Sequence, residues 1–414
     1  MNDRGLKLGP LDLLKGYLLS NVTDDAHNST AHESWKSMLD RLQRLGADED
    51  SSFFKNWLRA QHAESIRSKQ KDAQPGDFEL AADAYHRWVE NNSTKIGLIS
   101  SDHYYSLIQT RLPFFETYYS TCLKGENKFS GDYPALYFNG ARDLTLQSML
   151  VLSALDTSDS KPVAEVKIKL VSHYLDCYAT YRFINRQDNT YNNLRDPIFE
   201  LVKIIRRKPV TELVVLLEKS FDTFAKSPIS FTGISYHTDT PMALHLLGRI
   251  AHYLEVQLEL TNKVGFPAYI QRKKSNSTFD VEHLLPANIS ITKTELGADY
   301  DFASDEEHKT LRNSFGALIL LSRGRNRSLK DKPFSQKRDA YATEAVLAQT
   351  FCDSFYANNP QAQGHIDRLG LDLAPMAFIN KAPIQRREAL YNQIAQDIWG
   401  KSHLKRIASS VVSA

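Results

Sequence analysis

Two stretches in the C-terminal half of the chain decide the expected fold: FDVEHLLP at residues 279–286 and GALILLSRGRNRS at residues 316–328. The first is a short apolar strand that ends in an acid–histidine pair, Glu282-His283, and Pro286 follows three residues later. The second is another apolar strand, which leads to Asn326 at the mouth of a basic loop. The expected order of parts is therefore a strand, a second strand and a polar segment that bears an asparagine.

These residue types suit the hydrolysis of a phosphodiester. His283 can be neutral near pH 7 and can take a proton from water. Glu282 or Asp280, with the amide oxygen of Asn326, can bind a divalent cation, because Mg²⁺ prefers hard oxygen ligands. Alternation along a strand places Glu282 and His283 on opposite faces, so both reach one phosphate only where the strand breaks. Pro286 gives a reason for such a break.

The two stretches resemble the HNH-type (His-Me finger) nuclease domain of the GmrSD family of modification-dependent (type IV) restriction enzymes. The family pattern is roughly (D/E)-H-hydrophobic-x-P, then G-N-L-x-L-L, then N, then S-x-x-P-F-x-x-K. The matching segments here are EHLLP at 282–286, GALILL at 316–321, Asn326, and KDKPFSQK at 330–337. Ala317 stands where the family usually has Asn.

The resemblance implies a metal-dependent DNA endonuclease, the D-type subunit of a two-component antiphage restriction system that acts on modified DNA. It implies His283, Asn326 and Lys337 as catalytic residues. It also implies Glu282, Asp280 and Asn326 as ligands of Mg²⁺ or Mn²⁺. Two alternatives remain open: a catalytically degenerate assembly or sensor subunit, to which the departure from the family pattern would point, and an HNH nuclease that acts on RNA.

The N-terminus extends the resemblance. MNDRGLKL at 1–8 and DLLKGYLL at 12–19 resemble the block that closes the nucleotide-handling S domain in fused members of the family. The D-G-Q-Q-R block expected upstream of Arg4 does not occur in this sequence. We therefore expect a separate S-type, nucleotide-hydrolysing partner that docks on residues 1–25; the alternative is that the apolar set of this segment folds back on the chain. That set is Leu6, Leu8, Leu11, Leu14, Tyr17 and Leu18.

The overall charge is too balanced for a protein that binds nucleic acid with its whole surface, since the formal net charge is +2. DNA contacts must then come from a local patch. Positive side chains are concentrated between residues 323 and 338, where Asp331 is the counter-charge close by in sequence. A basic run in isolation is usually a solvated loop, but its position beside Asn326 favours phosphate contact. The candidate DNA-binding residues are Arg323, Arg325, Arg327, Lys330, Lys332 and Arg338.

The rest of the chain is mostly helical by its pattern. Much of residues 30–262 repeats apolar positions with a period of 3.6, and Asp196-Pro197 reads as the start of one helix. The expected fold is mostly α: a helical array with a small ββα-metal (HNH/His-Me finger) nuclease module and C-terminal helices. The expected segments are residues 1–25 for partner docking, 26–271 helical, 272–340 nuclease and 341–414 helical.

Composition narrows the setting of the protein. A chain of 414 residues with 42% hydrophobic residues can bury two or three cores. Three widely spaced cysteines give neither a disulfide framework nor a zinc knuckle, which fits a reducing cytoplasm. The charged N-terminus and the lack of any apolar stretch near 18 residues argue against secretion and membrane insertion.

Overall fold

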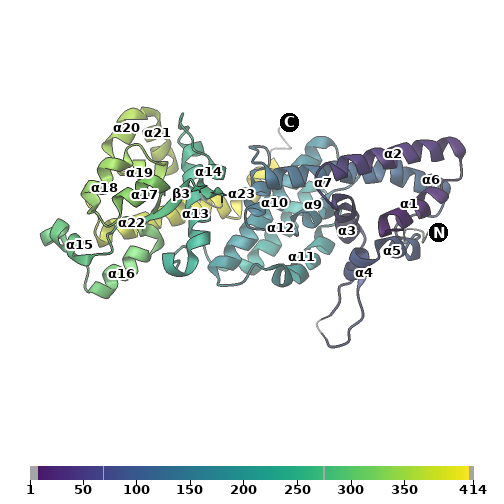
Figure 1. Cartoon of the computed structure of the whole chain (residues 1–414), viewed down its shortest axis with the longest axis horizontal. Helices are drawn as coiled ribbons and strands as arrows, with labels where there is room; N and C mark the ends of the chain where they lie inside the picture. Colours follow the sequence, from purple (N-terminus) through teal and green to yellow (C-terminus); the bar gives the residue numbers. More distant parts are fainter. Residues whose placement is uncertain (1–7, 69, 274–275, 410–414) are drawn as a thin grey trace, which may run out of the picture. The chain divides into compact units, whose positions relative to one another are not determined.

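The computed structural model describes residues 8–68, 70–273 and 276–409, and these residues are mostly helical (Figure 1). The chain forms two compact units. One comprises the chain up to Lys226 with the segment that begins at Lys401, and the other is Ser227–Gly400. The expectation of a mostly α fold is confirmed, whereas the four predicted segments stay a prediction. Within the described ranges, no helix is both long enough and apolar enough to cross a membrane.

The first unit is built from helices. They are α1 (Pro10–Ser20), α2 (Asp25–Gln43), α3 (Glu49–Gln61), α4 (Asp77–Asp83), α5 (Tyr85–Asn91), α6 (Ser101–Ser106), the π-helical turn η1 (Leu107–Arg111), α7 (Leu112–Asn127), α8 (Pro134–Gly140), α9 (Gln147–Ala154), α10 (Lys161–Ile184), α11 (Tyr191–Ile205), α12 (Val210–Phe224) and α23 (Ser402–Ser409).

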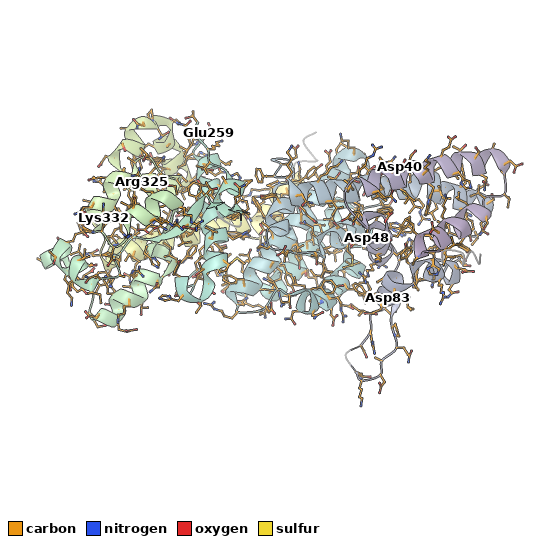
Figure 2. All side chains as sticks on the ribbon, viewed as in Figure 1. Asp40, Asp48, Asp83, Glu259, Arg325 and Lys332 are labelled. Carbon is orange, nitrogen blue, oxygen red and sulfur yellow. The ribbon has the colours of Figure 1, made fainter. Side chains whose placement is uncertain are left out.

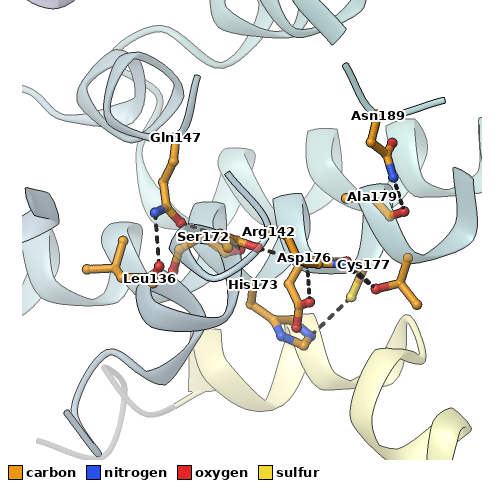
Figure 3. Close-up of polar contacts among 11 residues, drawn as sticks. Leu136, Arg142, Gln147, Ser172, His173, Asp176, Cys177, Ala179 and Asn189 are labelled. Atoms are coloured by element: carbon orange, nitrogen blue, oxygen red, sulfur yellow. Dashed lines mark hydrogen bonds and ion pairs between the residues drawn. The ribbon is translucent and has the colours of Figure 1, made fainter. Parts of the chain in front are cut away.

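Helix α10 forms much of the core of this unit, because it packs against α8, α9, α12 and α23 and is buried on most sides. A helix in that position must satisfy its polar side chains inside the protein. Figure 3 shows this network: Arg142 Nη2 donates to Asp176 Oδ1 at 2.6 Å, and Gln147 Nε2 donates to Leu136 O at 3.2 Å. These buried polar groups therefore have hydrogen-bond partners within the core, and their role is structural.

Helix α1 folds back on its own unit, where it contacts α2 and α5. Leu14 and Leu18 are each only 1% exposed, so these two members of the predicted docking set belong to the core. Leu8 is 63% exposed. Leu6 lies outside the described residues. The predicted docking set is thus divided between buried and exposed side chains.

One assignment of a helix start was wrong. The structure begins α11 at Tyr191, after the N-cap Thr190, and places Pro197 inside the helix. A proline there removes one backbone hydrogen bond. The earlier turn still forms and buries Leu194, which is 3% exposed, and this burial offsets the missing bond.

The second unit combines helices with short strands. Its elements are α13 (Tyr236–Gln257), α14 (Phe266–Ile270), β1 (Arg272–Lys273), β2 (Asn276–Ser277), β3 (Phe279–His283), α15 (Ile289–Leu296), the 3₁₀ turn η2 (Gly297–Asp299), α16 (Asp305–Asn313), the 3₁₀ turn η3 (Phe315–Ala317), β4 (Leu318–Ser322), α17 (Arg323–Leu329), α18 (Phe334–Tyr341), α19 (Val346–Gln349), α20 (Asp353–Asn358), α21 (Pro360–Leu369) and α22 (Lys381–Trp399).

Strands β3 and β4 pair antiparallel, with Phe279 opposite Ser322 and His283 opposite Leu318. Helices α13 and α17 pack against both strands, and α19 packs against β4. The four apolar residues of β4, from Leu318 to Leu321, are fully buried, as a continuous apolar run predicts for a strand covered on both faces. The segment after β4 is not the predicted basic loop but helix α17, so a helix directly follows the second strand.

Candidate active site

His283 is the last residue of β3, and the ladder with β4 continues one bond further, from Leu284 N to Ala317 O at 2.9 Å. Glu282 is 5% exposed and His283 is partly exposed. As neighbours on a strand, their side chains point to opposite faces. The strand therefore ends directly after the acid–histidine pair, before Pro286. His283 is placed where the chain leaves the sheet.

Asn313, at the end of α16, fixes the tautomer of His283. Its Oδ1 lies 3.1 Å from His283 Nε2, while its Nδ2 donates to Lys309 O at 2.7 Å. Because Lys309 O can only accept, the amide oxygen of Asn313 must face the ring, so Nε2 of His283 carries the hydrogen. Nδ1 then holds the lone pair and is the atom that can accept a proton. Tyr236 also contacts the ring edge-on, with centroids 4.4 Å apart.

The surroundings keep His283 neutral. Burial lowers its pKa to about 3, and the positive charge of Arg312 acts in the same direction, while the hydrogen bond to Asn313 opposes them. Arg312 is held in place by a bond from its Nε to Leu285 O at 3.1 Å. A neutral imidazole with an available lone pair is the form that a general base needs.

Glu282 and Lys337 form a buried ion pair, with Lys337 Nζ 2.6 Å from Glu282 Oε1. Lys337 is 1% exposed and also donates to His283 O at 2.8 Å, so α18 is bonded to the end of β3 through this one ammonium group. Burial raises the pKa of Glu282, although the Lys337 charge opposes the shift. Lys337 thus fixes the end of β3, the strand that carries Glu282 and His283.

Asn326 lies on α17, and its Nδ2 donates to Val281 O at 3.3 Å. Its amide oxygen is therefore the atom that can serve as a ligand. Asp280 lies on the other side of Val281 from Glu282 in sequence, and Arg323 Nε is 3.8 Å from its carboxylate. In the part of the chain that the structure describes, no group of three or more His, Cys, Asp or Glu side chains could hold a metal.

The donor chemistry at this strand nevertheless fits a magnesium site. Mg²⁺ is commonly held by one or two carboxylates together with waters and substrate phosphate, and it accepts an amide oxygen. Glu282, Asp280 and Asn326 supply these donor types. Each of the two carboxylates already faces a cation, Lys337 or Arg323, with which a metal ion would compete.

The six predicted DNA-binding residues fall into two groups. Three are paired with acids: Arg323 with Asp280, Arg325 with Glu344, and Arg338 with Asp353. Three others, Arg327, Lys330 and Lys332, are exposed and form no ion pair within the described residues. Figure 2 labels Arg325 and Lys332 on the ribbon of this unit. The predicted counter-charge, Asp331, instead accepts backbone hydrogen bonds from Ala287 and Asn288.

Three neighbours of His283 were not predicted from the sequence: Asn313, Arg312 and Tyr236. Asn313 is 8% exposed and is the last residue of the acidic amphipathic helix α16, where nothing in the local pattern marks it as a site residue. Tyr236 is the first residue of α13, and the sequence around it carries no signal of a site either. Only the packing of α16 and α13 around β3 reveals these contacts.

Comparison with known proteins finds a similarity that lies within the unit Ser227–Gly400. Residues 232–365 match the family model described as GmrSD restriction endonucleases, C-terminal domain. No curated protein and no solved structure matches the chain. The matched residues include β3, β4, α17 and α18, which hold the predicted site residues. Residues 232–365 are therefore similar to the C-terminal domain of the GmrSD restriction endonucleases, and this similarity supports a nuclease role for this unit.

Proposed function

We propose that the unit Ser227–Gly400 is a metal-dependent DNA endonuclease of the HNH (His-Me finger) type, with His283 as its general base. The observation that carries this proposal is the state of His283, which is neutral, ends β3 and is bonded through Nε2 to Asn313. The family match supports a restriction endonuclease role and a DNA substrate.

In this proposal the residues around β3 have distinct tasks. His283 Nδ1 takes a proton from the water that attacks the phosphorus. Lys337 positions β3 through its bonds to Glu282 and to His283 O. A pKa near 3 makes a weak base, but a negatively charged phosphodiester beside the ring would raise it, because an opposite charge favours the protonated form.

Mg²⁺ or Mn²⁺ would be held by Glu282, Asp280 and Asn326, and when bound it supplies positive charge that offsets the charge developing on the phosphate. Arg327, Lys330 and Lys332 are the cations that we expect to contact the DNA backbone first, since their charges are not already paired. Arg323, Arg325 and Arg338 would contact DNA by exchanging their acidic partners for phosphate.

We further propose that the protein acts in the cytoplasm against phage DNA with modified bases, as one component of a two-component system with an S-type, nucleotide-hydrolysing partner. The cytoplasmic setting is supported by the three widely spaced cysteines, and the other points by the family resemblance. The rival proposal is a catalytically degenerate assembly or sensor subunit, and the feature that favours it is Ala317, a fully buried residue where the family usually has Asn.

The deciding experiment replaces His283 with Ala. We expect cleavage of modified DNA to fall about 10²–10⁴-fold while the fold is retained, because a general base is needed only for the chemical step. A nicking assay with the purified chain and its partner gives the rate, and circular dichroism checks the fold. His365→Ala, which alters a histidine of α21 in the same unit, should leave the rate unchanged. Nicking by His283→Ala at the wild-type rate would reject the nuclease assignment and favour the assembly subunit.

A further inference from the structure

The helical unit contains a cavity of about 550 Å³ that no part of the proposed nuclease uses. Its lining comes from the end of α3, the segment at residues 95–97, η1, the turn at 156–157 and the segment that follows α11. A volume of this size is within the range of about 300–1,000 Å³ that is typical of small-molecule sites. The question is which chemistry the lining would recognise.

The lining is rich in positive charge. Lys95, Arg111, Arg206 and Arg207 line the cavity, against the two acids Glu64 and Asp156. The guanidinium group of Arg206 is paired with Glu64, but that carboxylate is itself exposed to solvent. Burial lowers the pKa of Arg111, and the nearby charge of Arg207 adds to this shift, so these two guanidinium groups repel each other, while the carboxylate of Asp156 opposes the shift. An anion in the cavity would relieve that repulsion.

Arg207 is held in position by the fold. Its φ is +56°, a left-handed conformation that costs a residue with a side chain about 1–2 kcal/mol. Its amide donates to Ser153 O at 2.8 Å, and its Nε donates to Gln61 Oε1 at 2.6 Å. Gln61 is oriented in turn by its Nε2, which donates to Leu152 O at 2.6 Å. The fold therefore fixes this guanidinium group beside the cavity at an energetic cost.

His62 is an independent indication that the cavity receives a polar ligand. It lines the cavity and is 7% exposed, and its Nε2 has no hydrogen-bond partner among the residues that the structure describes. A buried polar atom without a partner costs about 1–3 kcal/mol, so such atoms usually have one. A ligand oxygen in the cavity would supply the partner.

We propose that this cavity binds the phosphate group of a small phosphorylated ligand, such as a nucleoside phosphate or an inorganic polyphosphate. Arginine suits this ligand because its planar fork donates two hydrogen bonds to phosphate. The hollow form of the site favours a small ligand over duplex DNA, whose backbone is met by cations spread along an exposed surface. The buried Phe115 and Ile96 line the same cavity and would accommodate an uncharged organic part.

The test is calorimetric titration of the full chain with inorganic phosphate, pyrophosphate and ATP, without divalent metal so that the nuclease site is not loaded. We expect saturable 1:1 binding of pyrophosphate or ATP. Arg111→Gln and Arg207→Gln should each weaken it on the order of tenfold, the usual worth of a charge-assisted hydrogen bond. Tighter binding of ATP than of pyrophosphate would show that the nucleoside contributes, and equal binding would show that phosphate alone is recognised.

Two controls keep the test specific. Arg44→Gln removes an exposed charge at the end of α2, outside the cavity, and should leave affinity unchanged. Arg207→Lys keeps the charge but not the fork and should bind better than Arg207→Gln; all variants must melt as the wild type does. The proposal is overturned if no phosphate compound binds, if Arg44→Gln weakens binding as much as Arg207→Gln, or if only duplex DNA shows a response to the Arg207 substitution.

Discussion

At the scale of single residues, the burial of His283 has a consequence for stability as well as for catalysis. Its pKa is about 3 in the folded chain and about 6.5 when unfolded. Between these values the unfolded state binds the additional proton, so folding stability falls as the pH drops below about 6.5 and is unaffected by this group above it. The group should cost about 2 kcal/mol between pH 6.5 and pH 5, at about 1.4 kcal/mol per pH unit.

We therefore predict that His283→Gln, which does not titrate, loses less stability than the wild type on acidification from pH 7 to pH 5. Urea unfolding at several pH values measures the difference directly. The pKa of His252 is also lowered, to about 4 by burial, so both proteins retain part of the acid sensitivity. Parallel curves for the two proteins would show that His283 has an ordinary pKa.

The ion pair of Lys337 with Glu282 yields a second prediction. Lys337→Met keeps most of the side-chain length but leaves the buried carboxylate of Glu282 without its partner, which typically costs 3–5 kcal/mol. Lys332→Met is the matched control, because Lys332 is exposed and should change stability by less than about 0.5 kcal/mol. Equal unfolding midpoints for the two variants would contradict the buried pair.

The sequence predicts some of these residues and not others, for a physical reason. His283 and Asn326 stand in a motif whose spacing can be recognised along the chain. Asn313 and Arg312 act on His283 from a helix about 30 residues away, and their contacts depend on how α16 packs. The same holds for Arg323, whose pairing with Asp280 follows from the start of α17 beside β3 and has no linear signature.

At the scale of elements, Gly316 explains why the turn before β4 tolerates only the smallest residue. A Cβ at this position would overlap Ile384 O of α22 and approach Glu388 N to 2.9 Å. Arg387 and Tyr391 fix the same helix to the strand, since Arg387 Nε donates to Tyr391 Oη and that hydroxyl donates to Leu318 O. The backbone of α22 is thus held against η3 and cannot easily yield.

We predict that Gly316→Ala destabilises the protein by about 1–3 kcal/mol, the range for overpacking a tight contact. Gly324→Ala is the control, because a Cβ there meets no atom within 4 Å and the residue lies in helix α17, where Ala is favoured by up to about 1 kcal/mol. The two substitutions should shift the melting temperature in opposite directions. A fall with both would mean that the turn before β4 is not specially constrained.

The apolar pattern of the sequence alone predicts some of the elements but not others. The run from Leu318 to Leu321 was correctly predicted as a strand, because four consecutive buried apolar residues leave few alternatives. The basic segment after it was predicted as a loop, yet it forms α17. Its charged residues have good helix propensity, and only Leu329 anchors it by burial, so the apolar pattern that signals a helix is nearly missing.

At the scale of the whole molecule, the structure changes how the proposed partner site should be tested. Removal of residues 1–20 would delete Leu14 and Leu18, which belong to the core of the first unit. A truncated chain that no longer bound the partner could have lost either the docking surface or its fold, and the binding assay would not distinguish the two. Leu8 and Leu13 are the better targets, because they are 63% and 39% exposed.

We predict that Leu8→Asp/Leu13→Asp folds like the wild type but no longer co-purifies with the proposed S-type partner, because charges on an apolar docking surface would lose their water on binding. Leu80→Asp is the matched control: Leu80 is 41% exposed on α4 of the same unit and should leave co-purification unchanged. Cleavage of modified DNA by the mixture should fall with the double variant alone. Retention of the partner by the double variant at the wild-type level would place the docking surface elsewhere, whereas loss with Leu80→Asp as well would show a general effect of added charge.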